Sequence, residues 1–384
     1  MNHMLTEKEK EIRDKVKRFV EEDLNPISLQ VELEERIPGE IVDKMRAMKL
    51  FGLAIPEEFG GLGLTTLGEI LVYEELTKAN ACFRSRIGTS NGIGSMGILF
   101  DGTPEQQNRY LPRVASGEWT AAFALTEPNA GSDAASISTS AFLDGDHWII
   151  NGTKQFITNG DCADFFTTIV VTDEEKRTRG GFTAFIIERD SPGFFVGTPD
   201  NKMGIKGSHT TELVFKNCCV PKEHVIGGMP MVGQGFKTAM RVLDKGRLTM
   251  GACAVGASQK ILDMCMAHVK RKAKYGKSWD DLQSIQFVLA DMATEIYAAR
   301  QMLYNSARLR DQGNKVTHEA SMVKLFCTEM ADRIADRAID IFEDEGYLKK
   351  SQIEMYLRDV RLYRIFEGTS EIQRIVISRN LLKG

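Results

Sequence analysis

The chain has 384 residues, a formal net charge of -4 and a pI near 6.0. Because one hydrophobic core seldom serves so many residues, we expect two or three domains. The charge balance gives no basic footprint for DNA or RNA, so no nucleic-acid partner is expected. The N-terminus is too charged for a signal or transit peptide, and no apolar run is long enough for membrane insertion.

The cysteines favour a reducing compartment. There are seven, an odd number, with no C-x-x-C pair and no histidine at a ligand spacing from them. Structural disulfides and structural zinc sites usually leave one of these patterns. We therefore expect free thiols, a cytoplasmic location and no metal site.

Residues 1–119 are predicted to form an N-terminal α-helical domain. Thr6 and Glu9 have the spacing of a capping box, in which side chains and backbone N–H groups satisfy one another at a helix start. The segment 103–106, Thr-Pro-Glu-Gln, combines a cap residue, a proline at the first helical position and an acceptor three residues on. Both signals open amphipathic helices.

Residues 120–229 are predicted to form a middle β-domain of the barrel or sandwich type. Short runs rich in β-branched and aromatic residues alternate here with turn residues. The predicted strands are 148–160, 165–173, 181–189 and 212–221.

Residues 230–384 are predicted to form a C-terminal four-helix bundle. Helical periodicity returns after Gly235 and continues to the end of the chain. The predicted helices are 236–273, 282–312, 316–342 and 352–364. The fold class is therefore α+β with three domains.

One carboxylate stands out near the C-terminus, in FEGTSEIQR at 366–374. Glu367 precedes a predicted helix start, where Ser370 and Gln373 have the capping-box spacing. Such a carboxylate can be a surface acid that stabilises the helix dipole, or a base at the edge of a pocket. Its neighbours alone leave both interpretations open.

Two further segments can bind a ligand. In TEPNAGSD, 126–133, the proline, glycine and small residues predict an irregular loop whose N–H groups and hydroxyls can face a ligand. In FITNG, 156–160, an aromatic residue precedes a threonine by two positions at a strand end. A surface turn and a packing pair are the alternatives for these segments.

Together these motifs resemble the acyl-CoA dehydrogenases. TEPNAGSD, FITNG, a predicted helix start at 244–247, the pair Arg358 and Asp359, and FEGTSEIQR occur in the family's order and separations. Several ordered motifs are far more specific than any one of them. The resemblance covers essentially the whole chain and implies the same α, β, α domain order.

The resemblance implies FAD-dependent dehydrogenation of an acyl thioester to the enoyl thioester, with hydride passing to flavin N5. Glu367 matches the base of the short- and medium-chain enzymes, which removes the proton from the α-carbon. Some relatives carry the base instead at the position of Gly246. A base buried beside an acyl chain and a flavin would have a raised pKa, as proton abstraction near neutral pH requires.

Further site residues are implied by position in the family's motifs. Contacts to FAD are expected from Phe123, Leu125, Thr126, Ser132, Phe156, Thr158, Lys272, Gln283, Thr369 and Glu371. Contacts to the thioester substrate are expected from Ser132, Arg84, Asp244, Arg247 and Gly368. For Asp244 and Arg247, a simple ion pair at a helix start is the alternative.

The chain departs from the family where a neighbouring subunit usually holds the outer half of FAD. Lys272 replaces an arginine, which loses bidentate contact with a phosphate. The segment 340–344, Asp-Ile-Phe-Glu-Asp, replaces a Q-x-x-G-G turn and adds carboxylates where an anionic pyrophosphate should approach. Four explanations stay open: another route for the ADP end, weaker binding, a different partner chain, or drift compensated elsewhere.

Arg84 bears on the substrate. Arg84-Ser85 resembles the arginine and serine of glutaryl-CoA dehydrogenases, and similar pairs occur in relatives that act on acyl carrier proteins. An arginine facing a closed pocket needs an anionic or strongly polar partner. The alternative is a bond to Glu74, Glu75 or a helix end. By contrast, Arg86, Arg271 and Arg300 are expected to be ordinary solvated charges.

The sequence therefore predicts an FAD-dependent dehydrogenase of a short or polar acyl-CoA. The alternatives are a dehydrogenase of acyl groups on a carrier protein, a dicarboxylyl-CoA enzyme of the glutaryl-CoA type, and a flavin-poor scaffold subunit. The family's usual partners lead us to expect an electron-transfer flavoprotein or similar acceptor, and a homo-oligomer, either a tetramer or a dimer.

Overall fold

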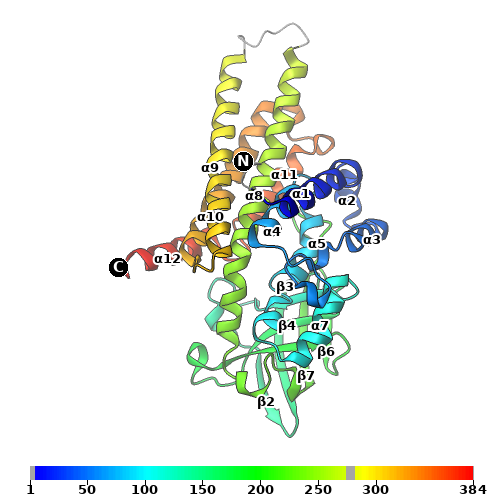
Figure 1. Cartoon of the computed structure of the whole chain (residues 1–384), viewed down its shortest axis with the longest axis vertical. Helices are drawn as coiled ribbons and strands as arrows, with labels where there is room; N and C mark the ends of the chain where they lie inside the picture. The colour runs from blue at the N-terminus through cyan, green and yellow to red at the C-terminus, as the bar shows by residue number, and fades with distance from the viewer. Residues whose placement is uncertain (1–4, 274–281, 384) are drawn as a thin grey trace.

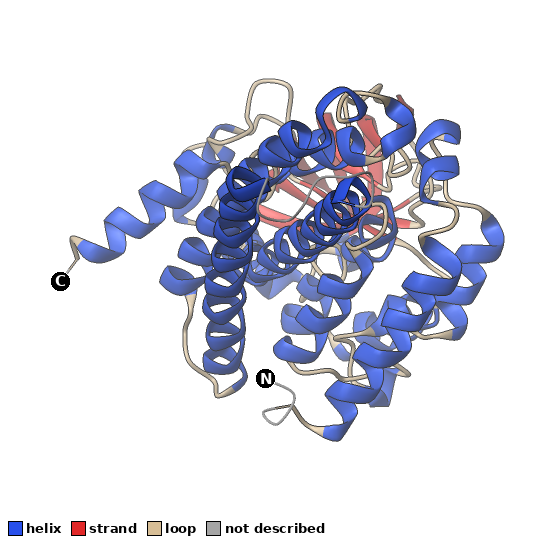
Figure 2. Cartoon of the chain, turned by 90° about the horizontal axis from the view of Figure 1, so that it is seen from above, coloured by secondary structure: helices blue, strands red, loops and turns tan. Residues whose placement is uncertain are grey.

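Helices, then strands, then helices follow one another along the chain, as the sequence predicts (Figure 1). The structure, a computed structural model, describes residues 5–273 and 282–383. Seen from above, the helices lie over and around the strands (Figure 2). The predicted α+β class, with a helical first part, a β middle part and a helical bundle, is confirmed.

The first part is built from helices with well-defined starts. They are α1 (Glu7–Phe19), α2 (Ser28–Glu34), α3 (Gly39–Ala47), α4 (Thr66–Leu76), α5 (Cys82–Asn91), α6 (Met96–Asp101) and α7 (Pro104–Ser116). Both predicted capping boxes are present, at Thr6 before α1 and at Thr103 before α7. Every residue of α4 is buried, so this helix lies inside the packing between the first part and the bundle.

The middle part is one curled sheet with the strand order β1-β4-β2-β3-β7-β6, in which β5 also pairs with β4. Its strands are β1 (Ala121–Ala124), β2 (Ser140–Asp144), β3 (His147–Thr158), β4 (Phe165–Val171), β5 (Phe182–Glu188), β6 (Phe194–Pro199) and β7 (Thr210–Pro221). The four predicted strands are β3, β4, β5 and β7. The sequence pattern does not predict β1, β2 and β6. The strand β1 has only four residues, β2 is mostly exposed, half of β6 is exposed, and the last two lack the apolar pattern.

A bulge in β3 shapes one end of the sheet. The antiparallel register of β3 and β7 shifts between Lys154 and Ile157, and the residue inside this shift, Phe156, has a φ of 60°. Its ring is 58% exposed although it belongs to a strand. Bulges of this kind redirect a side chain and are frequent beside active sites.

The last part is a helical bundle. Its helices are α8 (Gly235–Ala273), α9 (Gln283–Asp311), α10 (Thr317–Phe342), α11 (Ile353–Tyr363) and α12 (Ser370–Leu381). These bounds confirm the four predicted helices, and α12 projects sideways from the bundle (Figure 1). Because α8 is 39 residues long, it packs against the sheet at its start and against α9 and α10 further on.

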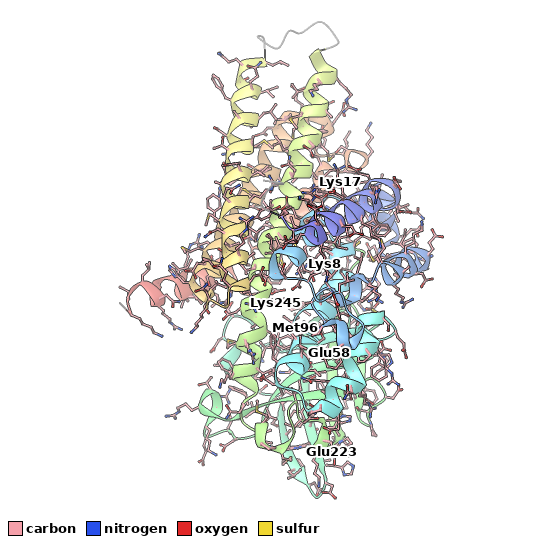
Figure 3. The ribbon with its side chains drawn as sticks, in the orientation of Figure 1. Lys8, Lys17, Glu58, Met96, Glu223 and Lys245 are labelled. Carbon is pink, nitrogen blue, oxygen red and sulfur yellow. The ribbon has the colours of Figure 1, made fainter. Side chains whose placement is uncertain are left out.

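One prediction about this part is wrong. The segment 244–247 lies inside α8 and not at a helix start, because α8 already begins at Gly235. Lys245 of this segment lies where the bundle meets the other two parts (Figure 3), 2.8 Å from Glu69 of α4.

None of the helices in the described ranges has the length and hydropathy of a membrane span, and all seven cysteines are free thiols.

Candidate active site

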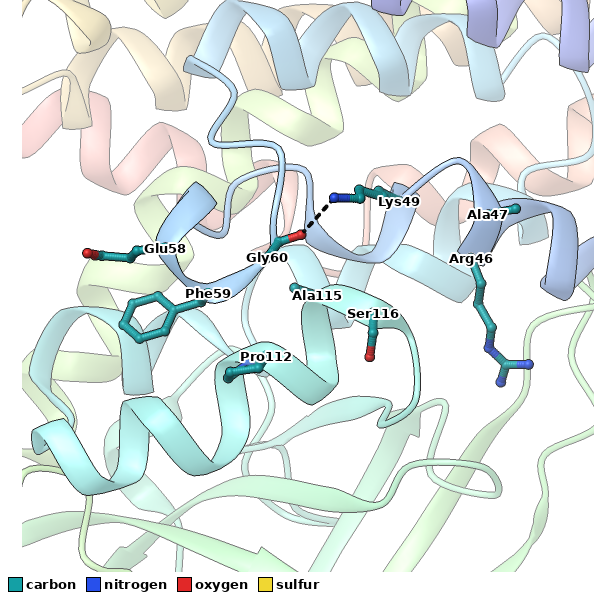
Figure 4. A pocket seen from close by; sticks show the side chains of 9 residues that line it. All are labelled: Arg46, Ala47, Lys49, Glu58, Phe59, Gly60, Pro112, Ala115 and Ser116. Atoms are coloured by element: carbon teal, nitrogen blue, oxygen red, sulfur yellow. Dashed lines mark hydrogen bonds between the residues drawn. The ribbon is translucent and has the colours of Figure 1, made fainter.

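One open cleft of the molecule lies away from the predicted base. It measures about 540 Å³ and lies between the 46–60 segment and α7 (Figure 4). Its lining includes Arg46, Lys49 and Phe59 but none of the residues predicted for catalysis or binding.

Glu367 lies in a turn between α11 and α12 with an unusual backbone. Glu367 and Gly368 have φ values of 58° and 89°, so two consecutive residues adopt the left-handed region. This region suits Gly368 but is strained for a glutamate. Two hydrogen bonds stabilise the turn. The Ser370 N–H donates to the Arg364 carbonyl across the turn (3.1 Å), and the Ser370 hydroxyl donates to Glu329 of α10 (2.6 Å).

The capping prediction for α12 is wrong in detail. The N-cap is Thr369, whose hydroxyl accepts from the Ile372 N–H at 3.3 Å, and Ser370 is the first helical residue. Gln373 instead donates to the carbonyl of Gly368 at 2.9 Å. The side chains predicted to cap the helix therefore hold the turn that carries Glu367.

The carboxylate of Glu367 is enclosed. Its side chain is 12% exposed, and Oε2 is buried without a hydrogen-bond partner among the described residues. The same oxygen fills the space beside Gly246 of α8, where a Cβ atom would lie 1.8 Å from it. Only glycine at position 246 allows this approach, so the absence of a carboxylate there and the presence of one at 367 are linked sterically.

Burial sets the ionisation of this group. Burial raises the pKa of the Glu367 carboxyl above its ordinary value, because the charged form loses water. Arg84, Lys324 and Arg247 partly oppose this rise in pKa through their positive charges. A carboxylate whose pKa is raised is a stronger base for proton abstraction.

Arg84 faces the same space. Its Nη2 lies 4.0 Å from Glu367 Oε1 and donates to the Thr249 hydroxyl at 2.9 Å, while the guanidinium lies over the ring of Tyr73 at 5.2 Å. Its Nε is buried without a partner in the described chain. Glu74 and Glu75 pair instead with Arg300 and Lys78, so neither glutamate is the partner of Arg84.

Glu367 and Arg84 line one small cavity. Its volume is about 10 Å³, and Lys245, Gly246 and Thr249 also line it. A space of this size holds about one water molecule, so an acyl group of any length requires movement of its walls.

The sheet end supplies residues that fit an isoalloxazine ring. The hydroxyls of Thr126, Ser132 and Thr158 make no hydrogen bond to the part of the chain that the structure describes, so each is available to a ligand. Phe123 and Leu125 are buried in β1 and just after it, whereas Phe156 presents an exposed ring. Hydroxyl donors beside an exposed aromatic face suit a planar polar heterocycle.

The loop that carries Thr126 is rigid. Lys154, which is fully buried, donates to the Leu125 carbonyl (3.0 Å) and to Glu127 (2.8 Å). Glu127 also accepts from the backbone N–H groups of Ser138 and Thr139. This buried ion pair fixes both ends of the loop and was not predicted from the sequence.

The residues expected at the outer half of FAD fit less well. The side chain of Lys272 lies outside the described residues, and Gln283 is exposed at the start of α9. In the segment 340–344, Asp340, Glu343 and Asp344 are exposed, and Glu343 has a φ of 52°. The carboxylates therefore remain the wrong charge for a pyrophosphate, and a residue other than glycine occupies a left-handed position.

Asp244 and Arg247 form the ion pair that was the alternative to a substrate contact, but inside α8 and not at a helix start. Arg247 Nη1 donates to Asp244 Oδ1 at 2.6 Å, and Asp244 Oδ2 accepts from the Thr317 hydroxyl at 2.8 Å. The Nε of Arg247 is buried without a partner in the described ranges. Arg247 therefore keeps one donor available for a ligand.

Two other arginines, Arg300 and Arg86, make specific contacts. Arg300 is not a solvated charge, since its side chain is 16% exposed and pairs with Glu74 at 2.8 Å. Arg86 is half-buried and donates to the Thr120 hydroxyl at 3.0 Å. Both arginines hold elements together, a role that a charge count along the sequence does not reveal.

Two residues near Glu367 were missed. Tyr73, on the fully buried α4, lies under Arg84, and Lys324, on α10, donates to the Gly368 carbonyl at 2.7 Å. A signal for Lys324 exists, because it is a lone charge inside the apolar run Met322–Cys327. Such a lysine is costly to bury unless it has a specific partner.

Known families and proteins resemble this chain over nearly its whole length. Family models described as acyl-CoA dehydrogenase N-terminal, middle and C-terminal domains match residues 6–118, 122–218 and 233–382. A short-chain-specific acyl-CoA dehydrogenase of Clostridium acetobutylicum is 37% identical, with 100% of each chain covered.

Two solved structures are also similar. A chain in a structure on the electron-transferring flavoprotein of Acidaminococcus fermentans has a TM-score of 0.95 and 38% identity, with 100% of each chain covered. The glutaryl-CoA dehydrogenase of Mycobacterium smegmatis has a TM-score of 0.92 and 28% identity, covering 100% of this chain and 97% of the other. The chain belongs to the acyl-CoA dehydrogenase family, whose members are flavoprotein oxidoreductases acting on CH–CH donors.

Proposed function

We propose that this chain is an FAD-dependent dehydrogenase that converts a short or polar acyl-CoA to the enoyl-CoA, with Glu367 as the base. One observation carries the proposal: the Glu367 carboxylate is buried, its Oε2 has no hydrogen-bond partner among the described residues, and its side chain lines a cavity with Arg84. A buried carboxylate oxygen without a hydrogen bond is costly, and a chain keeps one where chemistry requires it.

The turn supplies two parts of the reaction. The carboxylate of Glu367 takes the proton from the α-carbon of the thioester. The backbone N–H of Glu367 donates to no group within the described ranges, so it is available to the thioester carbonyl, where negative charge develops. Gly368 lets the substrate approach the backbone closely. Bound FAD, held by Phe123, Leu125, Thr126, Ser132, Phe156 and Thr158, would accept the hydride from the β-carbon.

The acyl group is proposed to be short, and either plain or polar at its far end. A short group is proposed because a relative that is 37% identical is described as short-chain specific. Arg84 supports a polar group, because its Nε lacks a hydrogen-bond partner among the described residues and its Nη2 lies 4.0 Å from Glu367. A dicarboxylyl-CoA would give this arginine a second carboxylate. An acyl group on a carrier protein is the alternative, and Asp244, Arg247 and Ser132 are the residues proposed to meet either handle.

The remaining features are proposed by analogy with the family. Phe287 and Tyr297 on α9 are each 62% exposed, which supports burial in a homo-oligomer. An electron-transfer flavoprotein is the proposed acceptor, since a similar chain occurs in a structure on that protein. We also propose domain boundaries at 119/120 and 229/230, and a reducing, cytoplasmic location in keeping with the free thiols.

Glu367→Gln tests the proposal, because the amide keeps the size of the side chain but removes its basicity. We expect the variant to bind flavin and to lose anaerobic bleaching by butyryl-CoA or glutaryl-CoA by several orders of magnitude. Lys260→Met, a charge-removing change on α8 away from the site, is the control and should bleach normally. Near-normal bleaching of the glutamine variant would remove Glu367 from the mechanism.

A further inference from the structure

A buried lysine contacts the turn that carries the proposed base. Lys324 is 0% exposed in the middle of α10, and its Nζ donates to the carbonyl of Gly368 at 2.7 Å. No other hydrogen-bond partner of this ammonium lies in the described residues, although it has three N–H groups. A lysine is seldom buried to this degree for packing alone.

The carbonyl that Lys324 holds is the one that fixes the turn. Gln373 of α12 donates to the same oxygen at 2.9 Å, so side chains from α10 and α12 both donate to one carbonyl. The two residues before and at this carbonyl, Glu367 and Gly368, are both left-handed. Because that conformation is strained at Glu367, it persists only where surrounding contacts hold it.

The charge of Lys324 also reaches the carboxylate. Burial lowers the pKa of Lys324 to about 8, and the nearby Glu367 and Glu329 act against this fall. The ammonium is therefore one of the positive charges around Glu367, with Arg84 of α5 and Arg247 of α8. Tyr73 of α4 and Cys253 of α8 also lie near Glu367, and burial raises the pKa of both, which favours their neutral forms. The carboxylate of Glu371 on α12 raises the pKa of Lys324.

We propose that Lys324 is a positioning residue for Glu367: it anchors the Gly368 carbonyl and stabilises the carboxylate form of the base. The inference rests on the proposed role of Glu367. The lysine touches neither substrate nor reacting atoms in this account. It acts through the backbone turn and through the electric field inside the site.

Lys324→Met in the flavin-loaded protein is the test, because methionine fills the same apolar channel without charge or donor. Two readouts are compared with wild type: the pH profile of anaerobic flavin bleaching, and the infrared titration of the Glu367 carboxyl, identified by its loss in Glu367→Gln. We expect both midpoints to rise by about one pH unit, since one nearby positive charge is removed. At a pH below the midpoint, bleaching should therefore slow about tenfold.

Lys260→Met is the matched control, since it also removes one partly buried lysine from the bundle, and it should leave both midpoints in place. Lys324→Arg should return the midpoints toward wild type. If Lys324→Met does not fold, Lys324→Gln, which keeps an N–H donor but no charge, should show the same rise.

Unchanged midpoints in a folded, flavin-bound Lys324→Met or Lys324→Gln protein would overturn the inference. The infrared readout does not need turnover, so it separates the two proposals. A rise of the infrared midpoint together with normal bleaching by Glu367→Gln would support the coupling while removing Glu367 as the base.

Discussion

Replacing Gly246 with alanine would press a methyl group against the carboxylate of Glu367. The added Cβ would lie 1.8 Å from Oε2 and 2.9 Å from Cδ, whereas real Cβ contacts are not shorter than 3.0 Å. The carboxylate must therefore move away by about 1.2 Å, the difference between the 1.8 Å distance to Oε2 and the 3.0 Å limit. A misplacement of about 1 Å in a catalytic group can cost about 100-fold in rate. We expect a loss of that order in kcat, with flavin still bound.

The stability of this variant should barely change. Alanine is more favourable than glycine inside a helix by about 1 kcal/mol, and the group displaced by the methyl is the flexible end of a side chain. The assay is single-turnover flavin bleaching, measured beside the thermal unfolding midpoint. Gly246→Ala is expected to lose rate while keeping its midpoint.

Gly251→Ala on the same helix should behave in the opposite way. Its Cβ would lie 2.5 Å from Val323 Cγ1 and 3.2 Å from Leu303 Cδ1, inside the bundle core. Overpacking there should lower the unfolding midpoint and leave the rate per folded, flavin-bound molecule unchanged. Wild-type bleaching by Gly246→Ala would refute the placement of the carboxylate against α8.

Three further predictions concern the substrate, stability and the cofactor. Arg84→Met should lower kcat/KM for glutaryl-CoA about 10 to 100-fold more than for butyryl-CoA, because a charged hydrogen bond is lost; equal losses would show that Arg84 does not contact the acyl end. Burial raises the pKa of Asp359 to about 7, so the protonated form is favoured in the folded state. The free energy of unfolding should therefore fall as the pH rises from about 4 to 7, by up to roughly 1.4 kcal/mol per unit, and Asp359→Asn should flatten this slope in urea titrations. A wild-type slope in that variant would contradict the assignment. The double change Glu343→Gly and Asp344→Gly should tighten FAD binding, measured by equilibrium dialysis, since it removes two like charges and relieves the φ of 52° at position 343. Unchanged affinity would indicate that the ADP end of FAD takes another route, and failure of both proteins to bind FAD would favour the scaffold alternative.

Much of the fold could be predicted because its signals are local. The capping boxes at Thr6 and Thr103 fix two helix starts within a few residues of sequence, and long apolar periodicity gives the helices of the bundle. The missed strand β6 has no such signal, because it is half-exposed and pairs only at one edge of the sheet. Thr369 rather than Ser370 caps α12, since Ser370 is drawn to Glu329, 41 residues away in sequence.

The site was predictable as a set of motifs but not as a set of contacts. Glu367 could be singled out from its motif, whereas its contact with Gly246 depends on how α8 packs against the turn. The surroundings of Arg84 could not be predicted, because Glu74 is within reach in sequence but pairs with Arg300 across the bundle. The lone charge of Lys324 in an apolar run is visible in the sequence, but its contact could not be predicted, because its partner lies 44 residues away on another element.

Hydrogen exchange at the α-carbon of the substrate tests the central claim most directly. The protein would be incubated with an acyl-CoA in deuterated water without an electron acceptor, and deuterium at the α-carbon would be followed by mass spectrometry. The account predicts rapid exchange with the wild-type protein and none above background with flavin-bound Glu367→Gln. Exchange at the wild-type rate in that variant would contradict it, because some other group would then be removing the proton.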